Sequence, residues 1–502
     1  MTTARSEAIA AGMPEQRLHP LSWLFELFNV LKQFIVPLLI LLFTGRGDRY
    51  EFWGLIGAGV MVPLAVARYY SFRYRIGADR IVIRSGLLQR TVRDIAFTRI
   101  QNVSLHRNPL HRLMGVAEVR LETGGGDKEE GRMRVLGLPE AERLRQLVRS
   151  GEAETPPAGA GVADDDAGNA ADAPLLQLDW RELLKLGLVS NKGMVLVAAG
   201  LGAAFQLDQG VARATLNRAA GWLWNQGAEL TAIGPARYAL AGLLVLLVAF
   251  VALRLISVAQ AFLHYHGFTL RADRQRLSLA RGLLNRFEGA LPRTRIQAWT
   301  LRQSWLQRQL ARFDLRVDAA GGKGAKSETM EAHWQLAPIA DAEQVAGIIN
   351  TVLPARAWPV DGWRPVHPDA WKREFKAPAL FLLVPAAILV YWLHAWGLLL
   401  LLSHPWLWFQ SKQWAKHAGY SYGHGLIAVR EGWIGKTWRF AEVRKVQAVY
   451  LKQSPFDRRH GMATVFCDTV NAGSFEPPLA VRYLPLAEAV ALHDAIAAAI
   501  AE

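Results

Sequence analysis

The sequence has a single cysteine, Cys467, among its 502 residues. One thiol excludes a framework of intramolecular disulfides and is typical of modules that face a reducing cytoplasm. Charged residues are also few, at 20%, whereas hydrophobic residues make up 51% and there are 18 tryptophans. This balance is typical of a protein that lies partly in a lipid bilayer.

Patterns that would indicate catalysis are absent from the sequence. It contains no nucleophile elbow, no acid/base pair and no dinucleotide-binding fingerprint. The glycines at 124–126 precede Asp127 and Lys128, but the phosphate-binding pattern G-x-x-x-x-G-K-[ST] is missing, so a hairpin turn is expected there. We therefore expect neither an enzyme nor a bound cofactor.

Metal-binding and secretion patterns are absent as well. Two histidine pairs could supply two ligands each, but no third ligand lies nearby at a recognisable spacing. These pairs are His264 with His266, which would share one side of a strand, and His417 with His424. The N-terminal residues lack an early apolar core and a small-residue cleavage site, so we expect no cleaved signal peptide.

A stretch of about thirty residues occurs three times without gaps, at 86–115, 282–311 and 432–461. Each copy opens with Gly, and a basic residue, a Gln and an Arg follow at fixed distances from it. Such matches predict triplication of one module. The shared residues are Arg99, Gln101 and Arg112 in the first copy, Arg295, Gln297 and Arg308 in the second, and Lys445, Gln447 and Arg458 in the third.

Apolar regions that we expect to form membrane helices precede each copy, although the first two are a little short for a span of roughly 20 residues. The first pair lies at 34–44 and 52–66, and the second at 193–207 and 238–253. Segment 377–411 carries no charge apart from histidine; at about 1.5 Å per residue it is long for one crossing and short for two. We expect a hairpin that turns near His394, although a re-entrant segment would also fit.

Each module reads as short strands, a turn and a final helix. Alternating β-branched residues predict the strands, and Pro139, Pro338 and Pro485 mark the start of the helix. The pattern G-[LW]-[LI] followed by R-[IV]-Q resembles the bacterial pleckstrin-homology (PH) module. The alternation with membrane hairpins is similar to the YdbT-type family of bacterial membrane proteins. The third copy has Lys445-Val446-Gln447 for the motif, and Ala311 replaces a loop glycine in the second.

The resemblance implies an α+β membrane protein, in which transmembrane hairpins alternate with three small antiparallel β-sandwich or barrel modules, each capped by a C-terminal helix. Arg68, Arg73 and Arg75 follow the first hairpin and predict, by the positive-inside rule, that the modules face the cytoplasm of a bacterial inner membrane. The expected division is a tail at 1–20, hairpin 21–68, module 69–150, flexible linker 151–176, membrane pair 177–263 with an external loop 208–237, module 264–355, linker 356–376, hairpin 377–411 and module 412–502.

The triplets are the best candidates for a binding site. They could contact lipid phosphate or an acidic partner; alternatively, the Gln pairs with backbone at a strand bend and the Arg fixes the following loop. The net charge of +15 favours anionic phospholipid headgroups, with the bilayer close by, over nucleic acid. We expect a non-enzymatic scaffold. Its partner could also be a membrane protein or another copy of the chain. The resemblance implies a role in envelope integrity or antimicrobial tolerance. The alternatives are a lipid-handling protein and a membrane enzyme.

Overall fold

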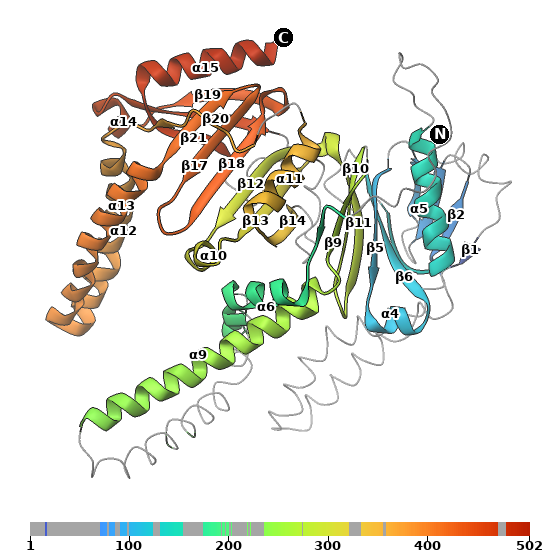
Figure 1. The fold of residues 1–502 in the computed structure, drawn as a ribbon, viewed down its shortest axis with the longest axis horizontal. Helices are drawn as coiled ribbons and strands as arrows, with labels where there is room; N and C mark the ends of the chain where they lie inside the picture. The colour runs from blue at the N-terminus through green and yellow to red at the C-terminus, as the bar shows by residue number, and fades with distance from the viewer. Residues whose placement is uncertain are drawn as a thin grey trace.

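The computed structural model describes residues 16–17, 71–77, 80–85, 91–97, 100–123, 131–153, 174–191, 235–273, 275–320, 333–354, 358–469 and 478–501, with isolated positions between 193 and 221. Within these ranges the chain forms three β-rich repeats, each followed by a helix, and helices that project from them (Figure 1). The predicted mixed α+β class with several antiparallel sheets is confirmed.

The described strands, and the short helix between the fifth and sixth strands, follow the same order in the three repeats. The first contains β1 (Gln16–Arg17), β2 (Arg73–Ile76), β3 (Arg80–Ser85), β4 (Thr91–Ala96), β5 (Ile100–Arg107), α4 (Pro109–Leu113), β6 (Val116–Thr123), β7 (Gly131–Gly137) and α5 (Leu138–Ala153). The second contains β8 (Leu176–Gln177), α6 (Trp180–Val189), α9 (Pro235–Tyr265), β9 (Thr269–Ala272), β10 (Arg276–Arg281), β11 (Arg286–Pro292), the 3-10 turn η4 (Arg293–Arg295), β12 (Ile296–Gln303), α10 (Trp305–Gln309), β13 (Phe313–Ala319), β14 (His333–Ala340) and α11 (Ala342–Val352). The third contains β15 (Arg364–Pro365), α12 (Ala370–Leu393), the 3-10 segment η5 (His394–Ser403), α13 (His404–His417), β16 (Gly419–Gly423), β17 (Leu426–Glu431), β18 (Lys436–Glu442), η6 (Val443–Lys445), β19 (Val446–Lys452), α14 (Pro455–Arg459), β20 (Met462–Thr469), β21 (Leu479–Pro485) and α15 (Leu486–Ala501).

The sheets do not follow the module boundaries. The last three strands of the first repeat and the first four of the second form one seven-stranded sheet, in the order β7-β6-β5-β11-β10-β9-β8. The second and third repeats share another, β14-β13-β12-β18-β17-β16-β15. The two ends of the chain supply smaller sheets, β1-β2-β3-β4 and β19-β20-β21. Neighbouring modules are therefore joined edge to edge by backbone hydrogen bonds and are not separate domains connected only by linkers.

A short strand lies before each apolar region and pairs with the strand that follows it. β1 pairs with β2, β8 with β9 and β15 with β16, all antiparallel. These two-residue strands fall in or at the end of the segments predicted as tail and linkers, and they are too short to leave a sequence pattern. Each apolar insertion thus leaves a sheet and returns to the same sheet.

Helix α9 is longer than the predicted span of 238–253. It runs to Tyr265, so His264 lies on the helix and His266 in the turn after it, and the expectation of one strand face for this pair was wrong. The charge of Arg254 ended the predicted apolar span but does not end the helix, and its Nη1 donates to the carbonyl oxygens of Leu188 and Ser190 at 3.1 and 3.2 Å. Residues 193–207 and the loop 208–237 lie almost wholly outside the described residues.

The third apolar segment turns where the sequence predicts. His394 has a φ of 53°, which ends α12 and directs η5 back along it. Trp371 near the start of α12 meets Trp408 of α13, with ring centroids 6.5 Å apart. In Figure 1, α12 and α13 lie alongside each other and project on the same side of the β-structure as α9.

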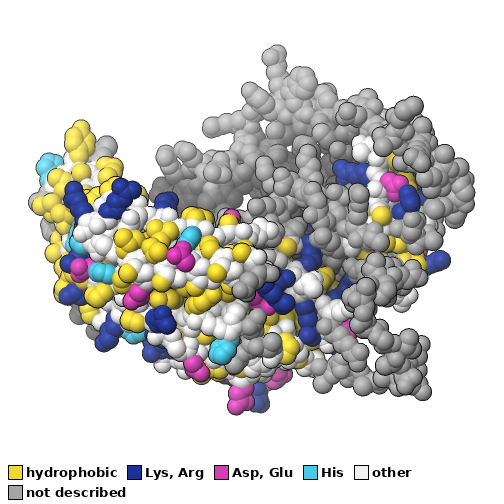
Figure 2. All heavy atoms as spheres, turned by 90° about the horizontal axis from the view of Figure 1, so that it is seen from above, with side chains coloured by type: hydrophobic (Ala, Val, Ile, Leu, Met, Phe, Trp, Pro, Cys, Tyr) yellow, Lys and Arg dark blue, Asp and Glu magenta, His cyan; other side chains and the backbone are white. Residues whose placement is uncertain are grey.

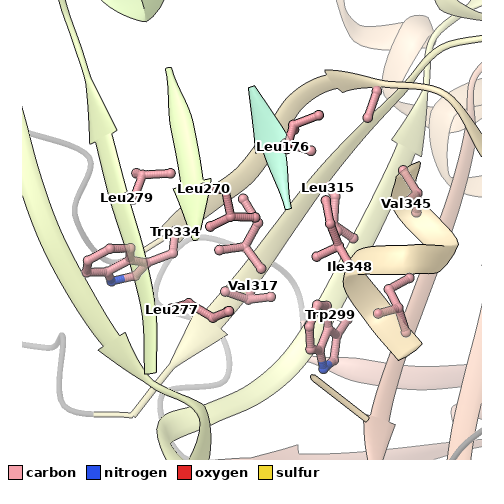
Figure 3. Close-up of a cluster of buried hydrophobic side chains, with 14 of the residues drawn as sticks. Leu176, Leu270, Leu277, Leu279, Trp299, Leu315, Val317, Trp334, Val345 and Ile348 are labelled. Atoms are coloured by element: carbon pink, nitrogen blue, oxygen red, sulfur yellow. The ribbon is translucent and has the colours of Figure 1, made fainter. Parts of the chain in front are cut away.

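Three hydrophobic clusters fill the repeats. The cluster of the first repeat contains only its own residues, such as Tyr74, Ile100 and Leu144. The second cluster, shown in Figure 3 around Trp299, Leu315 and Trp334, also includes Phe440 from the third repeat. The third cluster in turn includes Ala298 from β12. The second and third repeats therefore share core residues across their boundary.

The short helices α10 and α14 begin with a capping box, because Ser304 and Ser454 each accept a backbone hydrogen bond from the residue three positions on. A residue with positive φ follows each of these helices and their counterpart α4. Gly115 and Gly461 hold φ values of 65° and 63°, and Ala311 takes the same conformation at 52°. Ala311 thus keeps the glycine geometry at the cost of backbone strain.

Candidate functional site: the module junctions and hairpin bases

The shared glutamine occupies a β-bulge in each repeat. Ile100 and Asn102 oppose consecutive residues of β6, so Gln101 is the extra residue of its strand. The same shift lies at Gln297 in β12 and at Gln447 in β19. Gln297 is buried, and its Nε2 donates to the carbonyl oxygen of Arg295 at 3.3 Å. A bulge bends its strand, so this position shapes the corner between the two sheets of a module.

The basic residue of each triplet precedes the bulge. Arg99 and the side chain of Gln101 lie outside the described residues. Arg295 ends η4 and Lys445 ends η6, where the chain passes from one sheet to the next. The Lys445 amine donates to the carbonyl oxygen of Thr294 in the preceding module. Burial lowers the pKa of Lys445, opposed by the charge of Glu442.

The third residue lies at the other end of the strand. Arg112, Arg308 and Arg458 sit on α4, α10 and α14 and are exposed. A strand of eight residues spans about 26 Å, so these side chains do not meet the Gln of their own module. Arg112 instead crosses to the second module, where its Nη1 donates to the carbonyl oxygen of Leu283 at 2.9 Å. The triplet is therefore spread over the junctions rather than gathered in one pocket.

Charge holds the first junction, between β5 and β11. Glu288 accepts from Arg107 at 2.9 Å and from Arg286 at 2.8 Å, and Arg145 of α5 lies 3.5 Å away. Burial alone would raise the pKa of Glu288, but the bond from Arg286 and the three positive charges together hold it below its ordinary value. One carboxylate thus links the final helix of the first module to the second module.

Aromatic packing holds the second junction, between β12 and β18. Trp299 stacks on Phe440 with centroids 5.9 Å apart, and Trp358 covers the same ring at 4.4 Å. Beside them Arg439 of β18 donates to Asp318 of β13 at 2.7 Å, with both side chains largely buried. The pairing covers five residue pairs, against three in the first junction.

Helix α6, which packs against α9, is tied to the second module by a two-point ion pair. Arg312, just before β13, donates to both carboxylate oxygens of Glu182 on α6 at 3.0 Å. The bond from Arg312 lowers the pKa of Glu182. Helix α6 lies tightly against α9, since a Cβ on Gly187 would approach the Val258 Cα to 2.4 Å. At the far end of α9, Ala261 and Tyr265 enter the module core.

The base of the third hairpin carries aromatic and basic side chains in contact. Lys412 Nζ lies 4.1 Å from the Trp408 centroid and 5.3 Å from that of Trp371. Lys372 and Lys376 lie over Trp371 and Phe456. We call Trp371, Lys372, Lys376, Trp408 and Lys412 the hairpin-base collar. In Figure 2 the lobe at the left is mainly hydrophobic, with lysine and arginine side chains beside it.

Tyr483 of β21 connects this hairpin to the sheet. Its backbone has a φ of 55°, its hydroxyl donates to Glu374 of α12 at 3.3 Å, and its ring meets Trp414 edge-on. Burial, followed by the charge of Glu374, raises the pKa of Tyr483 to about 12. No motif in the sequence predicts this contact. A strained aromatic residue persists only where several surrounding contacts hold it.

Other candidates from the sequence carry little chemistry. The 124–126 turn lies outside the described residues, and the described part of the chain contains no group of three potential metal ligands. Cys467 is buried, which raises the pKa of its thiol to about 12. The two long apolar helices, by contrast, match the length of a bilayer: Gly242–Tyr265 within α9 and Ala370–Tyr391 within α12 are the two described spans apolar enough to cross a membrane.

The family model for the bacterial PH domain matches three segments, residues 26–152, 228–352 and 379–500. Together they cover more than half of the chain. The chain belongs to the bacterial PH-domain family. Each matched segment includes an apolar region as well as the strands after it, so the repeating unit contains both. The sequence-based recognition of three PH modules is confirmed.

A curated relative agrees with this assignment. The UPF0699 transmembrane protein YdbT of Bacillus subtilis (strain 168) is 22% identical over 484 residues, which cover 93% of this chain and 95% of that protein. The similarity therefore includes the apolar regions and all three modules. No solved structure matches the chain.

Proposed function

We propose that the chain is a multi-pass protein of the bacterial inner membrane, without enzymatic activity, that holds three PH-like modules at the cytoplasmic surface as one platform. The observation that carries this is the strand pairing around each apolar insertion. Because β1 pairs with β2, β8 with β9 and β15 with β16, each insertion begins and ends on one side. An insertion that crosses the membrane must therefore cross it an even number of times.

Basic residues beside the hairpins support the cytoplasmic side. Lys372, Arg373 and Lys376 precede the apolar part of α12, and Lys412 and Lys416 follow the returning arm. Cations close to a spanning segment favour the cytoplasm. Trp371 and Trp408 lie at the same level, as aromatic residues do at a membrane interface.

Cysteine labelling tests this orientation. In a Cys467→Ala background, Arg143→Cys, Glu343→Cys and Asp494→Cys place one exposed thiol on the final helix of each module, and His394→Cys places one at the hairpin turn. A membrane-impermeant maleimide should label the three module positions only after spheroplasts are lysed, and His394→Cys before lysis. Labelling of any module position in intact spheroplasts would refute the common cytoplasmic side.

The collar supports anionic phospholipid headgroups as the ligand of the platform. Each cation near a negatively charged bilayer surface contributes about 1 kcal/mol. The variant Lys372→Gln/Lys376→Gln/Lys412→Gln should therefore lower the binding of phosphatidylglycerol by at least about tenfold. The control Arg143→Gln/Arg271→Gln/Arg444→Gln removes three exposed cations elsewhere on the modules.

Native mass spectrometry of the full chain from phosphatidylglycerol–phosphatidylcholine micelles, at two salt concentrations, counts the lipids bound. A selective loss in the collar variant supports the lipid proposal. Equal losses of bound lipid in the collar and control variants, or no loss in either, would contradict specific lipid binding. The platform would then be expected to bind protein partners.

A further inference from the structure

The two junctions inside the chain use the same register. In the first, Leu105, His106 and Arg107 of β5 oppose Glu288, Phe287 and Arg286 of β11. In the second, Leu301, Arg302 and Gln303 of β12 oppose Trp438, Thr437 and Lys436 of β18. The gapless repeat alignment makes these the same three positions. One docking geometry therefore serves both junctions, although the side chains differ.

Among the described strands, the first and third repeats each leave one half of this junction unpaired. Strand β4 is the counterpart of β11 and β18, and β19 is the counterpart of β5 and β12. In the described part of the chain, β4 pairs only with β3, and β19 pairs only with β20. The described strands thus leave two complementary edges, that of β4 in the first repeat and that of β19 in the third.

The side chains of β19 are exposed where those of its counterpart are buried. Trp299 and Thr300 of β12 are each 2% exposed, whereas Tyr450, the counterpart of Thr300, is 46% exposed. Gln447 and Ala448 are exposed as well, and their counterparts Gln297 and Ala298 are buried. An open strand edge with exposed apolar side chains pairs readily with another strand.

The two outer edges carry the same pair of charged residue types as the buried ion pair of the second junction. There, Arg439 opposes Thr300 on β12 and bonds Asp318, which opposes Ala298. At the outer edges the counterpart of Arg439 is Arg93 of β4. The counterpart of Asp318 is Asp468, an exposed residue that opposes Ala448. A positive and a negative group are thus placed to meet if β4 and β19 pair in the same register.

We propose that a second copy of this chain adds its β4 to β19, continuing the platform head to tail. Val92, Arg93 and Asp94 of one copy oppose Leu451, Tyr450 and Val449 of the next, and Arg93 bonds Asp468. The occupant is another copy because one chain carries both edges and the two charges that fit each other. Such an interface joins different surfaces, so it builds a ring or a row of copies. Both described apolar helices project from one side, which lets the copies lie side by side in a membrane (Figure 1).

Disulfide trapping in the full chain tests this pairing. In a Cys467→Ala background, Arg93→Cys/Tyr450→Cys places thiols on opposed, exposed positions, and opposed antiparallel residues are close enough for a disulfide. Oxidation in native membranes should give a ladder of multimers that a reductant collapses. Neither single variant should give the ladder. The control Arg93→Cys/Gln447→Cys moves one thiol by three residues, about 10 Å, and should give at most a tenth of the product.

A charge swap tests the contact without cysteines. Arg93→Glu should weaken association in detergent, measured by light scattering after size exclusion, by about tenfold or more, and Arg93→Glu/Asp468→Arg should restore it. Both positions changed in these variants are exposed, and thermal melts verify the fold. The proposal is overturned if the chain stays monomeric at every density, if multimers form equally in the shifted control, or if the only disulfide is within one copy.

Discussion

The two internal junctions share a register but differ in chemistry. The first joins cores that contain no residue of the neighbouring module and is held by three arginines around Glu288. The second shares core residues in both directions, through Phe440 and Ala298, and adds stacked rings. Backbone pairing sets the geometry in both, and the side chains set the strength. We therefore expect added salt to weaken the first junction more than the second.

The largest effect is expected for Trp299→Ala. Trp299 is 2% exposed and packs on Phe440 at the boundary between two cores. Removing a buried Trp side chain costs about 3–5 kcal/mol of unfolding free energy. Chemical denaturation followed by circular dichroism measures it. Trp305→Ala, in the same module but with its side chain exposed, should cost less than about 0.5 kcal/mol. Equal losses in the two variants would contradict the shared core.

Asp318→Ala should have the next largest effect, a loss of about 3 kcal/mol of unfolding free energy, because it leaves Arg439 buried without its carboxylate partner. Replacing both, as Asp318→Leu/Arg439→Met, should recover most of the loss since no charge then stays buried. Glu142→Ala, which breaks the exposed Arg145–Glu142 pair, is the control, and about 0.5 kcal/mol is expected. The same denaturation measurement applies. If the double variant is no more stable than Asp318→Ala, the desolvation of Arg439 is not the cause of the lost stability.

Glu288→Gln should lower the unfolding free energy by about 1–2 kcal/mol at neutral pH and low salt. The pKa of Glu288 is lowered on folding, so its stabilisation is fully present above the ordinary value of about 4.5 and is lost as the pH falls through the lowered pKa. The wild-type chain should therefore lose contact between the first two modules below about pH 4.5, seen as faster proteolysis of linker 151–176 or hydrogen exchange in β5 and β11. The variant should lack this pH dependence. If the variant and the wild-type chain show the same pH dependence, packing and not Glu288 holds the first junction together.

The smallest effects concern the bulge glutamines. Gln297→Ala removes a buried side chain that bonds the Arg295 carbonyl, and about 1 kcal/mol is expected. Gln447→Ala changes an exposed residue at the equivalent bulge, and less than about 0.5 kcal/mol is expected for the isolated chain. Thermal melts of the two variants side by side measure the difference. A larger loss for Gln447→Ala would mean that this edge is already covered in the sample.

Much of the arrangement could be predicted from the sequence. Fixed spacing of Gln and Arg revealed the repeats, and the uncharged run around His394 revealed the turn of the third hairpin. The partners of the strands could not be predicted, because alternation shows that a segment is a strand but not which edge it joins. Leu176–Gln177 and Arg364–Pro365 are also too short to leave a periodic signal.

The candidate site shows the same division. The residue types of the triplets were recognised because they recur, whereas their contacts cross module boundaries, as Arg112 does to Leu283 and Lys445 to Thr294. Glu288 and Arg439 do not recur in all three copies, so the repeat pattern does not single them out. A comparison of what differs between copies at matched positions would have drawn attention to both.

The most direct test of the continuous platform is a disulfide across the second junction. Gln303 and Lys436 oppose each other in register, so Gln303→Cys/Lys436→Cys in the Cys467→Ala background should oxidise within one chain. A protease site inserted between 321 and 332 then cuts the chain between the two thiols. If β12 and β18 form one sheet, the two fragments stay joined until reduced, and the shifted control Gln303→Cys/Ile434→Cys gives far less product. Fragments that separate without reductant, or equal trapping in both variants, would mean that the modules are independent domains on flexible tethers.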